Sequence, residues 1–334
     1  MPASAVRAFT DPDAYHAALR YVQAQGIVTA RGDFRAELTR IDLHLLSMCR
    51  GEETLPRIVD SAVDPKWYGI GFATNPSQPS LYLSGQELSP ADIIVFGVGS
   101  TGHNRFAADC RWGSIALLHE DLAAAGEALI GRELAAPPFS QRIRPPPALL
   151  ARLSNLHEAA GNLAKSAPDI LAKPEVARML EQGLLQAMVS CISGGEAAEI
   201  GSVRRRHAAV VRRLEELLEA NCDRTLYVTE LCAAAGVSER TLLACCQEHL
   251  GMGPKRYLLL RRMHLARRAL LMADPATATV TEIITNFGFW ELGRFSVVYR
   301  SLFGELPSAS LRRTLDDPRP RKGDGSPWEP AEIA

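Results

Sequence analysis

The residues best suited to chemistry stand together near the C-terminus. Directly after Gly236, the sequence Val-Ser-Glu-Arg-Thr supplies Ser238, Arg240 and Thr241 within four positions. An arginine guanidinium can form two parallel hydrogen bonds with a guanine edge, and serine and threonine hydroxyls can donate or accept. This set of side chains is suited to recognising the edge of a base pair by binding.

These residues belong to one copy of an internal repeat. Val-Thr-Glu-Leu at 228–231 recurs as Val-Thr-Glu-Ile at 280–283, an offset of 52 residues that also relates Gly236 to Gly288. Beyond the glycine the offset becomes 53, and each copy ends in Gly-x-x-Pro. Each copy predicts a short helix, a glycine turn and a second amphipathic helix, which is the layout of a helix-turn-helix. We expect the two units at about 228–250 and 280–303, where they can place two recognition helices on one face of DNA.

Local signals support the turns and indicate which side chains face outward. Gly236 supplies the positive φ of a sharp turn, Ser238 can cap the helix that follows, and Thr279-x-x-Glu282 is a capping box. Spacing of four residues places Leu242 with Cys246, and Phe295 with Tyr299, on the buried faces. The residues then expected to face outward are Arg240, Thr241 and Ala244 in the first copy, and Glu291, Arg294 and Val297 in the second.

Between the copies, the segment from Lys255 to Met272 predicts one helix about 27 Å long at 1.5 Å per residue. Such a helix can hold two recognition helices about one DNA turn apart, roughly 34 Å. It carries three pairs of basic residues, among which we expect Arg256 and Arg262 to contact phosphates.

Charge is unevenly divided along the chain. Residues 204–313 hold 17 Lys and Arg against 11 Asp and Glu, whereas residues 1–203 hold 17 against 22. A basic segment beside an acidic one is typical of a DNA-binding domain attached to another domain.

Residues 20–135 contain short apolar runs separated by turn residues, as in a β-sandwich or small barrel. Residues 38–45 alternate apolar and polar with a period of two. Further strands are expected at 67–72, 80–83, 92–96 and 114–118, and a short helix at 122–129. The aromatic residues of the strands either fill the core or line an effector pocket, and both interpretations stay open. The candidate pocket residues are Trp67, Phe72, Tyr82 and Phe96.

The prolines at 137–147 indicate a linker, because proline stiffens a segment and is excluded from helix interiors. Apolar stripes of helical period follow over 149–160 and 176–188. The last residues, 314–334, contain few apolar side chains, and we expect them to be disordered. No apolar run approaches the roughly 18 residues of a membrane span and no secretory signal is visible, which predicts a cytoplasmic protein without membrane contact.

Histidines and cysteines offer two further hypotheses. His103 and His119, with Asp109 and Glu120, could suggest a metal site, but a cupin metal needs a close His-x-His pair because in-facing strand positions are two apart. These histidines are 16 apart, so we expect no metal and no cofactor.

The adjacent Cys245 and Cys246 could suggest redox sensing, or a thiolate that accepts methyl groups as in DNA repair. The seven cysteines are scattered, which favours free thiols in a reducing compartment. We expect Cys246 to be buried and Cys245 to be partly exposed.

At the repeat, the chain resembles the C-terminal DNA-binding domain of the AraC/XylS family of transcription regulators. The matching pattern runs from Leu231 to Arg312 and includes both glycine turns, both Gly-x-x-Pro ends and the joining helix. The resemblance implies seven helices, two helix-turn-helix units and binding in successive major grooves. By position it implies recognition-helix residues Ser238, Glu239, Arg240, Thr241 and Ala244 in the first unit, and Glu291, Leu292, Gly293, Arg294, Ser296 and Val297 in the second.

The second unit departs from the family pattern in its first helical turn. Glu291 stands where the family more often has Asp or Ser, and Gly293 replaces a frequent Ser, which weakens a helix by up to about 1 kcal/mol. Leu292 and Val297 offer no hydrogen bonds, so base recognition there would depend on apolar contact with thymine methyl groups.

The N-terminal part resembles the cupin-like sensor domain common in this family, through the alternation at 36–46 and the turn at 84–92. The fold class that we predict is an α+β multidomain protein. Its parts are a cupin-like β-barrel sensor domain at 1–135, a linker and helical dimerisation region at 136–203, an all-α tandem helix-turn-helix domain at 204–313 and a disordered tail at 314–334.

These features predict a sequence-specific DNA-binding transcription regulator, not an enzyme, that responds to an unidentified effector. Its partners would be double-stranded DNA, a small-molecule effector, a second copy of the chain and, for an activator, RNA polymerase. Two alternatives stay open. One is a cupin-type enzyme fused to a DNA-binding module, and the other is an architectural or repair protein that binds DNA without an effector.

Overall fold

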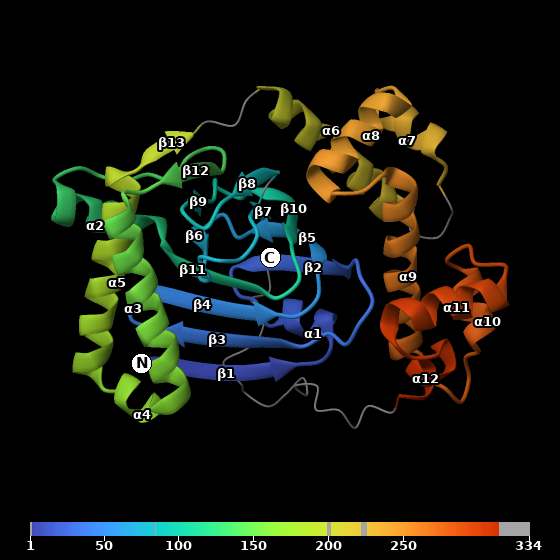
Figure 1. The fold of residues 1–334 in the computed structure, drawn as a ribbon, viewed down its shortest axis with the longest axis horizontal. Coiled ribbons are helices and arrows are strands. Elements are labelled where there is room, and N and C mark those ends of the chain that lie inside the picture. Colours follow the sequence, from blue (N-terminus) through green and yellow to red (C-terminus); the bar gives the residue numbers. More distant parts are fainter. Residues whose placement is uncertain (1, 84, 199–201, 222–225, 314–334) are drawn as a thin grey trace. The chain divides into compact units, whose positions relative to one another are not determined.

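The computed structural model describes residues 2–83, 85–198, 202–221 and 226–313 (Figure 1). The chain divides into two compact units, of which the first contains Met1–Gln25 and Phe34–Gly201. The second contains Gly26–Asp33 together with the chain from Ser202 onward. The tail that we expect to be disordered, 314–334, lies outside the described residues.

The larger sheet of the first unit has eight strands. Their spatial order is β1 (Ala3–Phe9), β3 (Ala36–Asp42), β4 (Leu46–Glu53), β11 (Cys110–Leu118), β6 (Trp67–Ala73), β9 (Ile93–Val95), β12 (Gln141–Arg144) and β13 (Glu196–Ala198). Neighbours pair antiparallel throughout. The expected strands at 67–72, 92–96 and 114–118 are confirmed as β6, β9 and part of β11.

The smaller sheet has five strands, and the expected strand at 80–83 lies in it as β7. Their order is β2 (Val22–Val28), β5 (Arg57–Val63), β10 (Thr101–Phe106), β7 (Leu81–Leu83) and β8 (Gln86–Leu88). Sequence patterning misses β5 and β10, because Asp60, Ser61, His103 and Asn104 interrupt their apolar alternation. Within the described residues each sheet is an open series of strands, so the unit is sheet-rich without a closed barrel.

Helices cover the larger sheet and close its core. They are α2 (His119–Ile130), α3 (Pro147–Ser166), α4 (Pro168–Leu171) and α5 (Pro174–Gly194), and a short α1 (Pro12–Ala17) follows the first strand. The expected linker at 137–147 instead contains β12 and the first residue of α3. Proline is well suited to that first helical position, because the N–H that it lacks would have no partner within the helix.

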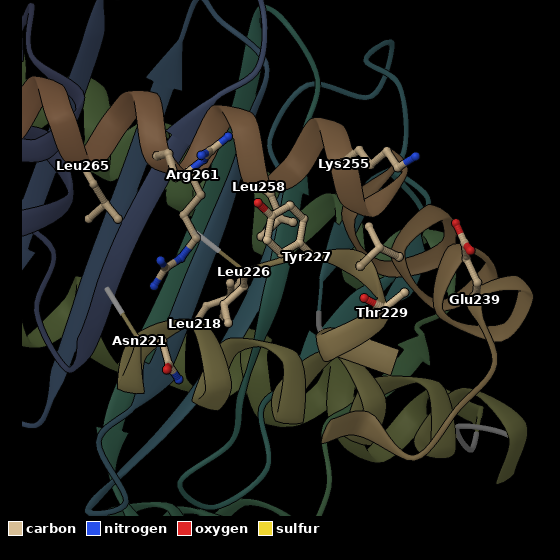
Figure 2. A pocket seen from close by; sticks show the side chains of 12 residues that line it. Leu218, Asn221, Leu226, Tyr227, Thr229, Glu239, Lys255, Leu258, Arg261 and Leu265 are labelled. Carbon is tan, nitrogen blue, oxygen red and sulfur yellow. The ribbon is translucent and has the colours of Figure 1, made fainter. Parts of the chain in front are cut away.

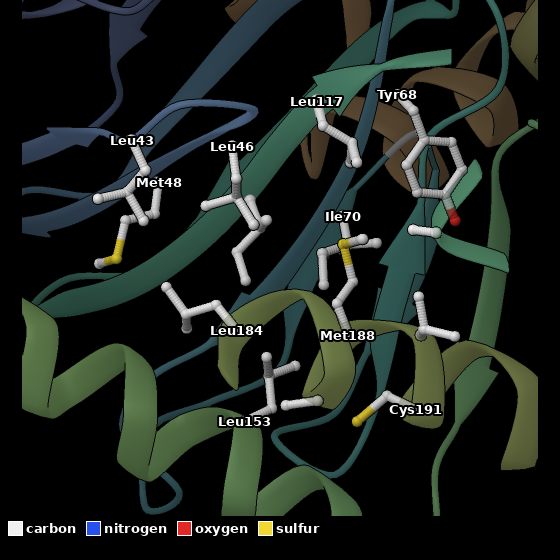
Figure 3. Packing of buried hydrophobic residues seen from close by; sticks show 14 of the residues in the cluster. Leu43, Leu46, Met48, Tyr68, Ile70, Leu117, Leu153, Leu184, Met188 and Cys191 are labelled. Carbon is white, nitrogen blue, oxygen red and sulfur yellow. The ribbon is translucent and has the colours of Figure 1, made fainter. Parts of the chain in front are cut away.

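The main core lies between the larger sheet and helices α3 and α5. Figure 3 shows Leu153 of α3 and Leu184, Met188 and Cys191 of α5 facing strand residues such as Ile70. Side chains of this size each contribute about 1.5–3 kcal/mol when they are fully buried.

One ionisable side chain is buried in this layer. The His157 ring of α3 places its Nε2 3.1 Å from the Cys49 carbonyl oxygen, and its centre lies 5.0 Å from the centre of the Phe72 ring in an edge-to-face arrangement. Burial lowers the pKa of His157 to about 4. The folded state therefore holds this imidazole neutral, and protonation opposes folding.

The second unit is helical. It contains α6 (Ser202–Ala220), α7 (Val228–Ala235), α8 (Glu239–Leu250), α9 (Pro254–Met272), α10 (Val280–Thr285), α11 (Leu292–Phe303) and α12 (Pro307–Arg312). The described part of this unit thus has the seven helices that the family resemblance implies.

We predict that His157 makes the first unit sensitive to acid. Because its pKa is about 4 in the folded state and about 6.5 in the unfolded chain, the unfolded state binds more protons between these values. Stability is then fully present above pH about 6.5 and is lost as the pH falls towards 4, by about 3 kcal/mol. Urea unfolding from pH 7 to 4 measures this loss. His157→Gln should flatten the dependence, whereas the exposed His44→Gln should keep it; equal slopes in both variants would contradict the assignment.

Candidate nucleic-acid interface

The turn of the first helix-turn-helix is built as the sequence predicts. Gly236 ends α7 with φ +67°, in the left-handed region that favours glycine. Ser238 caps α8, and its Oγ accepts a hydrogen bond from the Thr241 backbone N–H at 3.2 Å. Leu242 and Cys246 are fully buried on the inner face of α8. The packing of this face fixes which side of α8 stays in contact with solvent.

The predicted recognition residues of α8 lie at that surface. Ser238, Glu239, Arg240 and Ala244 are exposed, and Thr241 is half-buried. The Ser238 and Thr241 hydroxyls are 2.9 Å apart and share a hydrogen bond. The exposed side of α8 therefore begins with a cluster of hydrogen-bonding groups beside the Arg240 guanidinium.

The second helix-turn-helix repeats this construction with α10 and α11. The capping box is present, since the Thr279 N–H donates to the Glu282 carboxylate at 3.0 Å and Thr279 Oγ1 accepts from the Glu282 N–H at 3.2 Å. Gly288 has φ +73°. Phe295 and Tyr299 are buried, as predicted from their spacing.

The surface of α11 differs in character from that of α8. Glu291, Leu292, Gly293, Arg294 and Val297 are exposed, and Ser296 is half-buried with its hydroxyl donating to the Leu292 carbonyl oxygen at 2.9 Å. Arg294 and Glu291 lie 3.7 Å apart, both largely exposed, so their ion pair is weak. This surface offers apolar groups where α8 offers hydrogen bonds.

Sequence reasoning misses one exposed residue beside α11. Trp290 directly precedes the helix and is 77% exposed. The offset of 52 residues would have shown it, because that offset aligns Trp290 with Ser238 at the start of the first recognition helix.

The joining helix α9 buries one face in the unit. Its buried apolar side chains include Tyr257, Leu260, Met263, Ala266 and Leu270. At 1.5 Å per residue, a helix of this length spans about 28 Å. The helix α9 therefore carries both helix-turn-helix units on one rigid element, as expected.

Several basic side chains of α9 are engaged inside the unit. Arg261 lies 3.5 Å from the Glu215 carboxylate, and Arg267 lies 3.8 Å from Glu305. The predicted phosphate contact Arg262 is half-buried over the Phe289 ring, 5.1 Å from its centre, and burial lowers its pKa. The other predicted contact, Arg256, is exposed and donates a long hydrogen bond of 3.4 Å to the Thr29 carbonyl oxygen.

An early segment of the chain, Gly26–Asp33, belongs to the second unit and lies along α9; we call it the strap. The buried His264 ring has its Nε2 3.1 Å from the Val28 carbonyl oxygen, and Arg268 donates to the Gly26 carbonyl oxygen at 3.2 Å. Val28 is itself buried. The strap thereby satisfies its own backbone carbonyls with side chains of α9, an arrangement that no local sequence pattern indicates.

A hollow of about 520 Å³ lies within the second unit, between the end of α6, the start of α7 and α9 (Figure 2). Figure 2 shows Lys255 at the same end of the hollow as Thr229 and Glu239. Lys255 is exposed there. It therefore places a positive charge near the start of the first recognition helix.

The first unit contains a separate cavity of about 150 Å³, lined by strands of both sheets. Three of the four candidate pocket residues, Trp67, Phe72 and Phe96, line it. The fourth, Tyr82, does not, because Leu81 and Leu83 of the same strand do and successive strand residues face opposite sides. The Tyr82 ring instead lies 3.8 Å from the Arg105 guanidinium.

The polar groups of the cavity wall are largely paired. Arg57 donates to the fully buried Glu53 carboxylate at 2.6 Å, and the Tyr15 hydroxyl and Trp112 indole N–H donate to the same oxygen at 2.7 and 2.6 Å. The Asn104 amide donates to the Ser61 hydroxyl at 2.8 Å. The lining is thus mainly apolar, with Arg20 and the paired Arg57 as charged groups and a few uncharged hydrogen-bonding groups.

The histidine and cysteine hypotheses gain no support from the geometry. Within the described ranges, no three His, Cys, Asp or Glu side chains gather as metal ligands would. His103 lies near Asp60, at 3.9 Å, and His119 near the Pro65 carbonyl oxygen, at 2.9 Å.

Cys245 is fully buried rather than partly exposed, because it faces the core beside Cys246. Burial raises the pKa of both thiols, that of Cys246 to about 12. Both cysteines therefore remain protonated thiols near neutral pH, which is unsuited to nucleophilic or redox chemistry.

We predict opposite stability effects from two glycines of the interface. Gly236→Ala should destabilise the second unit by about 1 kcal/mol, because alanine in the left-handed region costs about 1–2 kcal/mol and recovers part of this from the unfolded chain. Gly293→Ala should stabilise it by about 0.5–1 kcal/mol, because Gly293 is helical and a Cβ there meets no atom within 4 Å. Calorimetric melting of the full chain tests the pair. Melting temperatures that shift in the same direction would contradict these backbone assignments.

The helical unit matches a known protein family, and the chain has similar relatives among known proteins. A family described as "Helix-turn-helix domain" matches residues 231–313. The "Probable thc operon regulatory protein" of Rhodococcus erythropolis is 35% identical over 146 residues, which cover 43% of this chain and 44% of that protein. The "XylDLEGF operon transcriptional activator 1" of Pseudomonas putida is 37% identical over 101 residues, 30% of each chain.

Among solved structures, a probable AraC family transcriptional regulator from Rhodopseudomonas palustris CGA009 is 37% identical and covers 31% of this chain and 95% of its own, with a TM-score of 0.28. The matched part of this chain spans less than half the length of the two curated relatives. The family match covers residues 231–313, so this part of the chain is a helix-turn-helix domain, and the chain is similar to AraC/XylS-type transcription regulators.

Proposed function

We propose that the whole chain is a sequence-specific DNA-binding regulator of transcription that responds to a small-molecule effector. The observation that carries this proposal is the pair of exposed recognition helices, α8 and α11, joined through helix α9, one face of which is buried. Their residues meet the requirement of a major-groove reader, namely a rigid helix with accessible side chains on its outer face. The reaction is binding rather than catalysis.

Electrostatics supports DNA as the partner. The segment 204–313 has six more basic than acidic residues, and Lys255, Arg256, Arg294 and Arg300 are exposed on it. Contacts of such side chains with phosphates supply affinity without sequence information. Arg262 would contribute mainly through its packing under α10 and α11, because Phe289 covers its guanidinium.

The first unit is proposed to be the effector-binding part, in the manner of a cupin-like sensor. The cavity between its two sheets is lined mainly by apolar side chains, and its volume of about 150 Å³ suits a molecule about the size of one aromatic ring. Trp67, Phe72 and Phe96 would contact the effector, and Ser61 or Asn104 could orient it.

Assembly and location follow from the same proposal. We place a homodimer contact on the outer face of α3 and α5, where Met179 is 75% exposed. A dimer of this kind would act in the cytoplasm and, as the name of the Pseudomonas putida relative suggests, would activate transcription with RNA polymerase as a partner. No helix in the described parts of the chain is long and apolar enough to cross a membrane.

The alternative of a cupin-type enzyme has less support. The described residues gather neither a metal-ligand set nor a nucleophile activated by lowering of its pKa. An architectural protein without an effector would bind DNA independently of sequence. Selection of bound duplexes from random sequences distinguishes this case from sequence-specific binding.

Selection of bound duplexes from a random-sequence pool should yield a shared motif with two half-sites. We predict that Arg240→Ala then weakens binding by about 1–3 kcal/mol and relaxes preference at one base position, because arginine can bond guanine with two N–H groups. Arg132→Ala, which removes an exposed arginine from the first unit away from α3 and α5, is the matched control and should bind like the wild type. Recovery of no shared motif would leave sequence-specific regulation without support.

The effector hypothesis has a thermal test. A ligand that binds only the folded state stabilises it by about 2.7 kcal/mol at a hundredfold excess over its dissociation constant. A melting-temperature screen of small, weakly polar metabolites on the full chain should therefore give at least one hit. Trp67→Ala should abolish that shift and Phe139→Ala, which removes an exposed ring elsewhere, should retain it. A hit unaffected by Trp67→Ala would place the ligand outside this cavity.

A further inference from the structure

The start of α11 presents an apolar surface that no part of its own unit covers to any large extent. Trp290 is 77% exposed, Val297 70% and Leu292 41%. Tryptophan is among the more buried residue types on average, and clustered exposed apolar side chains mark interaction sites. We call Trp290, Leu292 and Val297 the apolar stripe.

Helix geometry puts Val297 of the stripe on the outward side of α11. Phe295, Tyr299 and Leu302 are buried and follow the i, i+4, i+7 spacing of the inner face. Gly293 and Val297 share the opposite side at a spacing of four residues. Because Gly293 carries no side chain and a Cβ there would meet no atom within 4 Å, the approach to Val297 stays open.

The repeat aligns the residues of the second helix-turn-helix with those of the first and shows where their side chains differ. With the offset of 53 residues, Gly293 stands in the place of Arg240 and Val297 in that of Ala244. With the offset of 52, Trp290 stands in the place of Ser238. At these matched positions the second unit thus has tryptophan in place of a serine, no side chain in place of an arginine, and a larger apolar side chain in place of an alanine.

The surroundings of the stripe favour nucleic acid as its occupant. Arg294 and Arg300 are exposed on the same helix, and the segment 204–313 carries an excess of basic residues. A purely apolar protein partner would not need that charge, whereas flanking phosphates would. On the base edges of the major groove the one apolar group is the C5-methyl of thymine.

We propose that α11 reads a thymine-containing half-site through contact of Trp290 and Val297 with thymine methyl groups, while α8 reads its half-site through hydrogen bonds. This inference rests on the proposed DNA-binding function. It assigns to Trp290 a role in sequence specificity and divides the operator into two chemically distinct halves.

The test removes only the methyl groups. In a duplex recovered by selection, the half-site whose preference relaxes in Arg240→Ala is assigned to α8 and the other to α11. Deoxyuridine then replaces thymine in one half-site at a time, which keeps every hydrogen-bonding group of the base pair. We expect affinity to fall about fourfold for each methyl contacted in the α11 half-site, and to change by less than twofold for the α8 half-site.

Protein variants complete a double-mutant cycle. Trp290→Ala and Val297→Ala should weaken binding to thymine DNA and should lose sensitivity to deoxyuridine, because the protein group that contacts the thymine methyl is then absent. Phe139→Ala, which removes an exposed aromatic side chain from the first unit, should leave both affinities unchanged.

Two results would overturn the proposal while leaving DNA binding intact. One is wild-type affinity that ignores deoxyuridine in the α11 half-site. The other is a loss in Trp290→Ala that is equal on thymine and deoxyuridine DNA, which would assign the ring to the sugar–phosphate backbone. Absence of any specific DNA binding by the wild type would instead remove the proposed function itself.

Discussion

Burial of the inner face of α9 is the constraint on which the second unit depends. Tyr257, Met263 and Leu270 are buried along it at intervals of nearly two turns, and the helix packs against elements of both helix-turn-helix units. Because one helix organises both cores, the two recognition helices cannot vary their separation freely. The helix length of about 28 Å lies close to the roughly 34 Å of one DNA turn. Burial of the apolar face of α9 thus sets the distance between the two recognition helices.

Around α9, ion pairs of the second unit join its helices to one another and do not lie at the recognition surface. Glu305 accepts from the Ser310 hydroxyl at 2.7 Å and from Arg313 at 3.1 Å, and lies 3.8 Å from the buried Arg267. These bonds connect α12 to α9 behind the recognition surface. Counting arginines along the sequence therefore overstates how many are available to phosphates, since several of them hold the unit together.

The helical unit was largely predictable because its signals are local. Gly236, Ser238 and the Thr279–Glu282 capping box each act within a few residues, and the repeat doubled the evidence. The sheet-rich unit was predictable only where apolar runs are unbroken. Strands β5 and β10 carry polar residues that are tolerated because partners across the sheet satisfy them, as with Asn104 and Ser61.

The predictions that are wrong at single residues concern which face of a strand or helix a side chain takes. Residue type and rough periodicity misplace Tyr82 and Cys245, because a shift of one position along a strand or helix changes the face that a side chain takes. Residue type also fails to indicate that Trp290 is exposed, because a tryptophan is expected in a core. The cavity of the first unit depends on pairing over long sequence distances, as between Glu53 and Trp112, which composition cannot show.

The strap makes the second unit discontinuous in sequence, and this has a consequence for how the protein is made. Residues 26–33 leave the ribosome early, whereas α9, to which His264 and Arg268 belong, follows more than 220 residues later. Domains made of contiguous chain can fold as they emerge. In this unit, the strap can pack only after α9 has been synthesised. The strap is therefore separated from α9 for most of synthesis. Exchange of the C-terminal module between relatives would preserve folding only where the strap still fits α9.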